Sequence, residues 1–193
     1  MLNFENYIQV LRTSYDAGYV RKAFYSALEL IGGIPEEEQR FVFCSVKVAG
    51  KDADWIKTNN ALNAFEFKLN RKLWKRKSRK QKMLMVKAIE PNSGNLTYHF
   101  HALIKIEDLK VILTDDELQY IIKNIIMELD ETNSRNPNLL QVDVFRFKEE
   151  NLNTPYDDFG KCLHYCVKTS SKHYNPLSNI ILTKKQQEQK QLL

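Results

Sequence analysis

Hydrophobic residues in this chain recur with two different periods, one typical of helices and one typical of strands. Apolar positions three or four residues apart predict an amphipathic helix. Four stretches carry that spacing: residues 3–30, a stretch that begins near residue 55 and extends into the lysine- and arginine-rich segment at 68–82, residues 114 to about 129, and residues 158–170. Gly18 breaks or kinks the first helix, and Gly32 and Gly33 end it. Thr114 and Glu117 have the spacing of a capping box and so begin the third helix.

Four other stretches alternate apolar and polar residues or are rich in β-branched and aromatic residues, as strands are: residues 40–48, 82–90, 97–106 and 139–147. Turn residues at 91–95 join the second of these strands to the third, so the two should form a hairpin. Strands and helices interleaved in this order predict the α+β class. We expect a central, mostly antiparallel sheet of about four to five strands, flanked by helices.

The length of 193 residues suits one domain with a sizeable core, and we expect residues 1–193 to form a single domain. Within it, residues 1–35 are expected to be a helical extension and residues 184–193 a polar tail. Three cysteines argue against a disulfide framework and favour a reducing compartment, so we expect a cytoplasmic protein. No apolar run reaches the roughly 18–20 residues of a membrane helix, so we expect no membrane partner.

Positive charge is concentrated in one short segment. Residues 68–82 hold nine lysines and arginines and no acidic residue, which exceeds the net charge of +5 of the whole chain. The rest of the chain therefore carries a net negative charge. A localised basic block is the electrostatic footprint of a polyphosphate partner. The alternative interpretation is a helix end that is simply solvated.

Two of the four histidines form the sequence His99-Phe100-His101 on a predicted strand. Because strand side chains alternate between faces, both imidazoles project to one side, where their spacing suits chelation of a divalent cation. Glu90 ends the preceding strand and lies across the turn from His99, so it is the natural third ligand. Glu107 lies about 20 Å beyond His101 along a strand, too far to share the ion. The alternative is a pair of half-exposed structural histidines.

A second candidate group lies on the last predicted helix. Tyr165 and Lys168 are three residues apart and so share a helical face. A tyrosine phenol can attack a phosphodiester when a nearby cation favours its reactive form. The alternative for Tyr165 is a packed, hydrogen-bonded side chain. Cys162 and Cys166 are interpreted as small buried residues rather than as zinc ligands, because His164 lies on a different side of the helix.

Together these motifs resemble the HUH endonuclease superfamily, in particular the rolling-circle replication initiators of plasmids and small viruses. The segment His99-Phe100-His101 matches the family's His-hydrophobic-His strand, and Tyr165-Cys166-Val167-Lys168 matches its helical Tyr-x-x-Lys motif, in the same order. Glu90 stands where related initiators have an acidic metal ligand. The resemblance covers roughly residues 40–172 and does not explain residues 1–35.

The resemblance implies a metal and a reaction. Mg²⁺ or Mn²⁺ held by Glu90, His99 and His101 would polarise a phosphate of single-stranded DNA at a replication origin. Tyr165 would attack that phosphate as the nucleophile, which leaves a 5′-phosphotyrosine link and a free 3′-OH. Lys168 would position the tyrosine or screen charge.

The implied partners are single-stranded DNA and a host helicase and polymerase, since the chain lacks a Gly-x-x-x-x-Gly-Lys phosphate loop. Six basic residues would hold backbone phosphates: Lys68, Arg71, Lys72, Lys75, Arg76 and Arg79. Trp74 beside them is either a platform for an unpaired base or a core anchor. Two alternative functions are a transposase or relaxase with the same chemistry and a non-catalytic nucleic-acid-binding module on the same scaffold.

Overall fold

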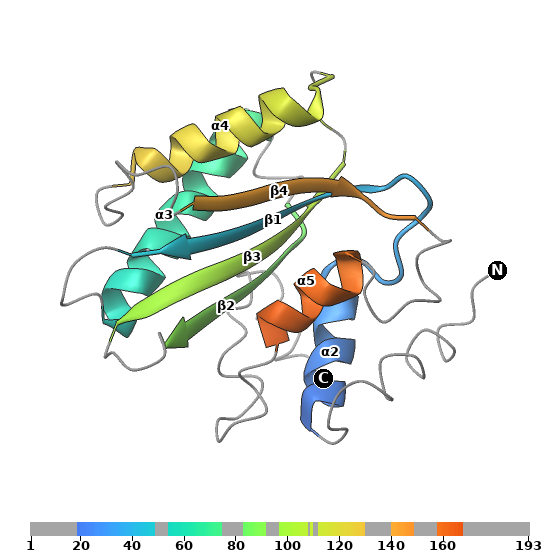
Figure 1. Cartoon of the computed structure of the whole chain (residues 1–193), viewed down its shortest axis with the longest axis horizontal. Helices are drawn as coiled ribbons and strands as arrows, with labels where there is room; N and C mark the ends of the chain where they lie inside the picture. The colour runs from blue at the N-terminus through green and yellow to red at the C-terminus, as the bar shows by residue number, and fades with distance from the viewer. Residues whose placement is uncertain are drawn as a thin grey trace.

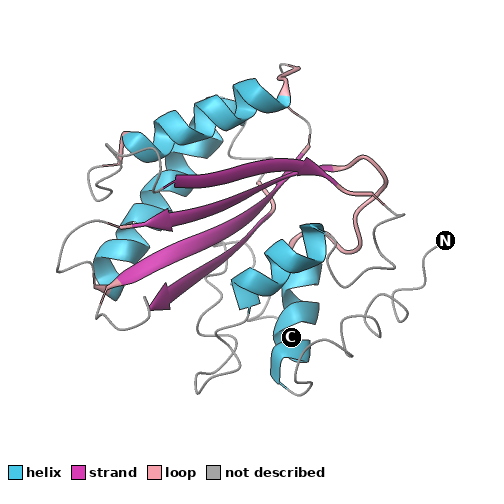
Figure 2. Ribbon diagram, viewed as in Figure 1, coloured by secondary structure: helices cyan, strands magenta, loops and turns pink. Residues whose placement is uncertain are grey.

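The structure is a computed structural model, and it describes residues 19–48, 54–74, 83–91, 97–107, 109, 112–129, 140–148 and 158–167. Its helices are α2 (Tyr19–Leu30), α3 (Trp55–Trp74), α4 (Asp115–Met127) and α5 (Asp158–Val167). Its strands are β1 (Arg40–Lys47), β2 (Met85–Pro91), β3 (Tyr98–Ile106) and β4 (Leu140–Arg146). Figure 2 shows these strands side by side, with helices on both faces of the sheet.

The described strands form one antiparallel sheet in the order β2-β3-β1-β4. Helices α3 and α4 cover one face of this sheet, and α2 and α5 cover the other (Figure 1). Strand β1 is central, and both of its faces carry apolar residues: Phe41 and Phe43 point toward α2 and α5, and Val42 and Val46 toward α3 and α4. The predicted α+β class with a central antiparallel sheet is confirmed, and so is the predicted hairpin of β2 and β3.

The layer of α3 and α4 holds the larger core. On α3 the apolar residues that recur at helical spacing are all buried: Leu62, Phe65, Leu69 and Leu73. Trp74 ends this row with only 4% of its surface exposed, and its indole N–H donates a hydrogen bond to the carbonyl of Glu107 at 3.1 Å. A buried indole needs such an acceptor. Of the two roles considered for Trp74, the structure therefore assigns it that of a core anchor.

One charged pair lies inside this core. Lys87 of β2 stands between Met85 and Ile89 on the face toward α3, and it is 1% exposed. Its ammonium group pairs with the Glu66 carboxylate of α3, with 2.5 Å between Nζ and Oε2. A buried ammonium group without a partner is strongly unfavourable, so this pair restricts which face of β2 can point toward α3.

The other layer begins with α2, which buries Phe24, Leu28 and Ile31 against the sheet. The helix ends where the two glycines were expected to end it. Gly32 and Gly33 have φ angles of 96° and 90°, a left-handed conformation that glycine adopts without steric cost. The amide of Gly33 then donates to the carbonyl of Leu28 at 2.8 Å, which satisfies one of the helix's terminal acceptors.

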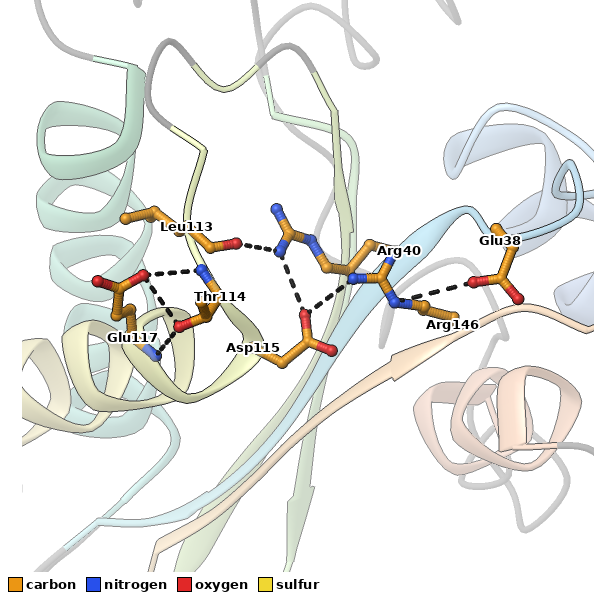
Figure 3. A network of polar contacts seen from close by, with 7 residues as sticks. All are labelled: Glu38, Arg40, Leu113, Thr114, Asp115, Glu117 and Arg146. Atoms are coloured by element: carbon orange, nitrogen blue, oxygen red, sulfur yellow. Dashed lines mark hydrogen bonds and ion pairs between the residues drawn. The ribbon is translucent and has the colours of Figure 1, made fainter.

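A polar network fastens α4 to the end of the sheet (Figure 3). Arg40 of β1 and Arg146 of β4 are register partners, and both approach the same carboxylate oxygen of Asp115, at 3.2 Å and 3.4 Å. Arg40 also donates to the carbonyl of Leu113 at 2.6 Å, and Arg146 lies 3.8 Å from Glu38. The first turn of α4 is therefore placed by two strands that are far apart in sequence.

Some sequence predictions concern residues outside the described ranges. These include the first part of the N-terminal extension (residues 1–18) and the polar tail (residues 184–193). The turn at 91–95 is described only at Pro91, which ends β2. Among the described residues, no helix is both long and apolar enough to cross a membrane.

The predicted capping box at the start of α4 is present. The Thr114 hydroxyl accepts a hydrogen bond from the Glu117 amide at 3.2 Å, and the Glu117 carboxylate accepts one from the Thr114 amide at 2.8 Å. The Thr114 hydroxyl also donates to the Glu117 carboxylate at 2.9 Å. The two hydrogen bonds that this carboxylate accepts, from the Thr114 amide first and from the Thr114 hydroxyl second, hold the pKa of Glu117 below its ordinary value of 4.5. The carboxylate form of Glu117 therefore stabilises the folded state.

We predict that Thr114→Ala lowers the free energy of unfolding by about 1 kcal/mol, because the first turn of α4 loses its side-chain cap. Urea unfolding at pH 7 followed by circular dichroism measures this loss. Thr114→Ser is the control, since it keeps the hydroxyl and should unfold close to wild type. Equal stability of all three proteins would contradict the capping role.

The same cap has a pH dependence with a defined sign. A carboxyl whose pKa is lowered in the folded state contributes stability above its unfolded pKa, and the contribution is lost as pH falls through the folded pKa. The stability difference between wild type and Glu117→Gln should therefore be largest above pH 4.5 and shrink as the pH falls below it. Urea unfolding at a series of pH values tests this, and a difference independent of pH would contradict it.

Candidate metal centre

Strands β2 and β3 bring three ligating side chains to one face of the sheet. In the hairpin, Glu90 is the register partner of His99, and Ala88 is the partner of His101. Alternation along β3 sends Phe100 to the opposite face, where it packs against Phe65 of α3 with ring centroids 5.9 Å apart. The expectation that Glu90 lies across the hairpin from His99 is therefore confirmed, and the three ligands share the face covered by α2 and α5.

The three ligand atoms of this group lie close together. The Oε2 atom of Glu90 is 3.2 Å from Nε2 of His99 and 2.9 Å from Nε2 of His101. All three ligand atoms lie within 4.8 Å of one another. Neighbouring ligands of an octahedral ion with bonds of about 2.1 Å are about 3 Å apart, so both carboxylate–imidazole spacings suit a single ion. Two imidazoles and a carboxylate are donors that transition-metal ions, Mn²⁺ among them, accept.

Burial makes this arrangement chemically demanding. Glu90 is 5% exposed and His101 is 4% exposed, whereas His99 is half-buried at the rim. A carboxylate removed from water needs compensation from hydrogen-bond donors or from a cation. Imidazole N–H groups can compensate part of the buried negative charge, and a divalent ion held among the three side chains would compensate it more completely. The buried Glu90–His99–His101 group can therefore bind a metal ion.

Helix α5 places Tyr165 beside this group. Its ring centroid is 6.0 Å from that of His101 and 6.1 Å from that of Phe43, and Phe43 itself stacks on His101 at 5.7 Å. The helix is anchored by Phe159 and Leu163, which are buried against the sheet, whereas Tyr165 keeps 39% of its surface exposed. A partly exposed tyrosine ring thus lies next to His101, one of the three candidate metal ligands.

Of the other predicted site residues besides Tyr165, the three that the structure describes lie away from this centre. Lys68, Arg71 and Lys72 lie on α3, which covers the opposite face of the sheet (Figure 1). Their predicted contact with DNA stays a prediction, and the structure does not bring them together with the histidines. Four further candidates lie outside the described residues: Lys75, Arg76, Arg79 and Lys168.

Two residues that the sequence analysis did not single out stand directly beside the histidines. Ser45 and Lys47 of β1 are the register partners of His101 and His99 on β3, and they face the same side of the sheet. Lys47 is exposed there. Because Ser45 and Lys47 are two residues apart on a predicted strand, the sequence alone could have shown that they share one face of β1. Their position beside the histidines depends on strand pairing across more than fifty residues of chain, which no local pattern specifies.

The cysteines of this region are not arranged as a second metal site. Burial raises the pKa of the Cys166 thiol, and the thiol of Cys44 on the other face of the sheet is affected in the same way. Both therefore remain thiols at neutral pH, whereas zinc binds the thiolate. Within the described residues, Glu90, His99 and His101 are the one cluster of three ligating side chains.

We predict that the protein binds Mn²⁺ and that Glu90→Gln weakens this binding by at least about tenfold. Loss of a residue that only hydrogen-bonds to a metal ligand already lowers metal affinity about tenfold, so loss of a ligand's charge should lower it at least as much. The substitution keeps the shape of the side chain and removes the charge that attracts the ion. Electron paramagnetic resonance of unbound Mn²⁺ during a titration measures the affinity directly.

Glu107→Gln is the matched control for this titration, since Glu107 is an exposed acidic residue near the histidines in sequence. It should bind Mn²⁺ like wild type. Thermal unfolding of each variant checks that the fold is kept. Failure of the wild type to bind, or equal binding by Glu90→Gln and Glu107→Gln, would rule out the proposed ligand set.

We also predict that Cys44 and Cys166 resist alkylation by iodoacetamide at pH 7 in the native protein, because burial disfavours the reactive thiolate. Cys162 is half-buried on the same helix as Cys166 and should react first. Peptide mass mapping of native and urea-denatured samples separates the three sites. Rapid labelling of native Cys166 would show that α5 does not stay packed on the sheet.

No family model, curated protein or solved structure matches this chain. The chemistry of the site therefore has to be inferred from its own residues. These are an acid and two histidines on one face of a hairpin, together with an exposed tyrosine from the packed helix α5.

Proposed function

We propose that this protein is a metal-dependent nicking and joining endonuclease of the HUH type, and that it acts as a single-tyrosine replication initiator. The observation that carries the proposal is the position of Tyr165 beside the Glu90–His99–His101 group, with its ring 6.0 Å from that of His101. A metal site alone has many uses. A solvent-accessible phenol at its edge favours attack on a phosphate ester.

The donor set supports a phosphodiester substrate. Two neutral imidazoles and one carboxylate would hold a divalent ion whose remaining net positive charge would attract phosphate oxygens. Mg²⁺ or Mn²⁺ bound there would polarise the scissile phosphate and orient it for in-line attack. His101 and Glu90 are buried, so their positions are set by the sheet before the substrate arrives.

In the proposed reaction, the Tyr165 oxygen attacks phosphorus and the bond to the 3′ oxygen breaks. The phenol proton is lost, the leaving oxygen gains a proton, and the DNA strand ends in a free 3′-OH and a 5′-phosphotyrosine. The phosphodiester is exchanged for another phosphoester of similar energy, so a 3′-OH can later reverse the step and rejoin the strand. Lys168 would position the tyrosine or screen charge.

The sheet surface beside the histidines suits an extended single strand. Helix α5 packs against β2 and β3, and the neighbouring polar residues of β1 and β4 on this face include Ser45, Lys47 and Gln141. Lys47 is exposed next to His99 and can neutralise a flanking phosphate. In this proposal the DNA comes from a replication origin, and a host helicase and polymerase carry out unwinding and synthesis.

We predict that wild-type protein forms a covalent adduct with single-stranded DNA in the presence of Mn²⁺, and that Tyr165→Phe abolishes it because the attacking oxygen is gone. The substrate is a labelled random-sequence pool, first enriched for strands that bind the Tyr165→Phe protein, so that recognition is separated from cleavage. A denaturing gel shows the adduct, and EDTA should remove it.

Tyr120→Phe is the matched control, because Tyr120 is an exposed tyrosine on α4, in the layer away from the histidines. It should form the adduct at the wild-type level. If the enriched strands bind all three proteins and none forms an adduct, the catalytic proposal fails and a nucleic-acid-binding module takes its place. An adduct that persists in Tyr165→Phe would assign the nucleophile to another residue.

A further inference from the structure

A groove runs between α3 and α4 on the layer that faces away from the metal centre. Its volume is about 730 Å³, and we call it the α3–α4 groove. The lining residues that matter here are Phe67, Lys68, Arg71, Tyr120, Ile121 and Met127. None of these side chains takes part in the nicking reaction proposed above, and the sheet separates them from Glu90 and the histidines.

The groove exposes large apolar side chains. Phe67 is 60% exposed, Tyr120 is 69% exposed and Met127 is 44% exposed. Aromatic side chains and methionine are enriched where protein surfaces bind a partner, because they provide contact area at a small entropic cost. Ile121 is partly buried between them and packs on the core. The apolar side chains therefore lie together along one groove.

Cations flank this apolar strip. Lys68 joins the two helices, since its ammonium group donates to the carbonyl of Glu128 at 2.7 Å. The Arg71 guanidinium lies 5.5 Å from the centre of the Phe67 ring, and Lys72 follows it on α3. Among the described residues that line the groove, Glu128 is the one acid, so their summed charge is positive and complements an acidic partner.

The dimensions of the strip suit a helix. Tyr120 and Met127 are seven residues apart on α4 and so about 10 Å apart along its axis. A second helix laid alongside presents residues i and i+7 at the same separation, with i+3 or i+4 between them. Nucleic acid fits less well, because its phosphates gain nothing from Met127 or Ile121 and would have to be seated over apolar surface.

We propose that the α3–α4 groove docks an acidic, amphipathic helix of a partner protein. The apolar side chains of that helix pack on Phe67, Tyr120 and Met127, and its acidic side chains face Arg71 and Lys72. Because the groove and the metal centre lie on opposite faces of the sheet, the protein can hold its partner and its DNA at the same time. Such a contact would recruit another protein to the site where the DNA is cut.

The test uses a fluorescein-labelled synthetic helix with leucine at positions i, i+4, i+7 and i+11 and glutamate on its other faces. Fluorescence anisotropy with the full chain measures its affinity. We expect saturable binding that weakens at least tenfold in the double variant Arg71→Glu with Lys72→Glu, and also in Phe67→Ser. The control, Lys148→Glu with Lys161→Glu, makes the same charge change at two exposed lysines elsewhere and should bind like wild type.

Two further probes distinguish docking from simple charge attraction. A peptide with serine in place of leucine should bind at least tenfold more weakly, and so should one with lysine in place of glutamate. Absence of saturable binding, or equal binding by the serine peptide, overturns the proposal. The proposal is likewise overturned if the groove variants bind single-stranded DNA more weakly than wild type and the acidic peptide binds none of the proteins. That result would assign the groove to nucleic acid.

Discussion

The buried pair of Lys87 and Glu66 restricts how β2 can join the sheet, and the candidate metal centre depends on that placement. Because Lys87 is directed toward α3, the alternation of side chains along β2 places Glu90 on the opposite face, where the two histidines of β3 lie. A slip of one residue would reverse every side chain of β2. It would then leave an unpaired ammonium group in the α2–α5 core and move Glu90 away from its partners, and breaking a buried ion pair typically costs about 3–5 kcal/mol.

The sheet also divides the molecule into two surfaces with different properties. The α2–α5 face is polar at the end where His99 and His101 pair with Lys47 and Ser45, and there it holds an acid from β2, two imidazoles and an exposed phenol. The α3–α4 layer is apolar inside apart from the Lys87–Glu66 pair, and it bears an apolar groove with a basic flank outside. The described part of the basic segment, which is Lys68, Arg71 and Lys72, therefore lies on the side of the sheet opposite the buried acid and histidines.

Local patterns predicted much of this molecule correctly. Three short-range features are present as predicted. Thr114 and Glu117 form a capping box, His99 and His101 share one face of β3, and the β2–β3 hairpin places Glu90 opposite His99. Other features needed the fold. Phe43 and Lys47 stand beside the histidines only because β1 pairs with β3, and the burial of Trp74 depends on a carbonyl from a distant strand end.

By itself, the sequence determined the elements, the class of fold and the choice of Glu90, His99 and His101 as candidate ligands, which the structure brings together. These follow from side-chain period, turn residues and capping, which act over a few residues and are legible without tertiary contacts. Only the tertiary structure decided that Tyr165 approaches His101, that Lys68, Arg71 and Lys72 lie on the opposite layer, and that two helices leave a groove. Those relations arise from packing between segments far apart in the chain, for which the sequence carries no local signal.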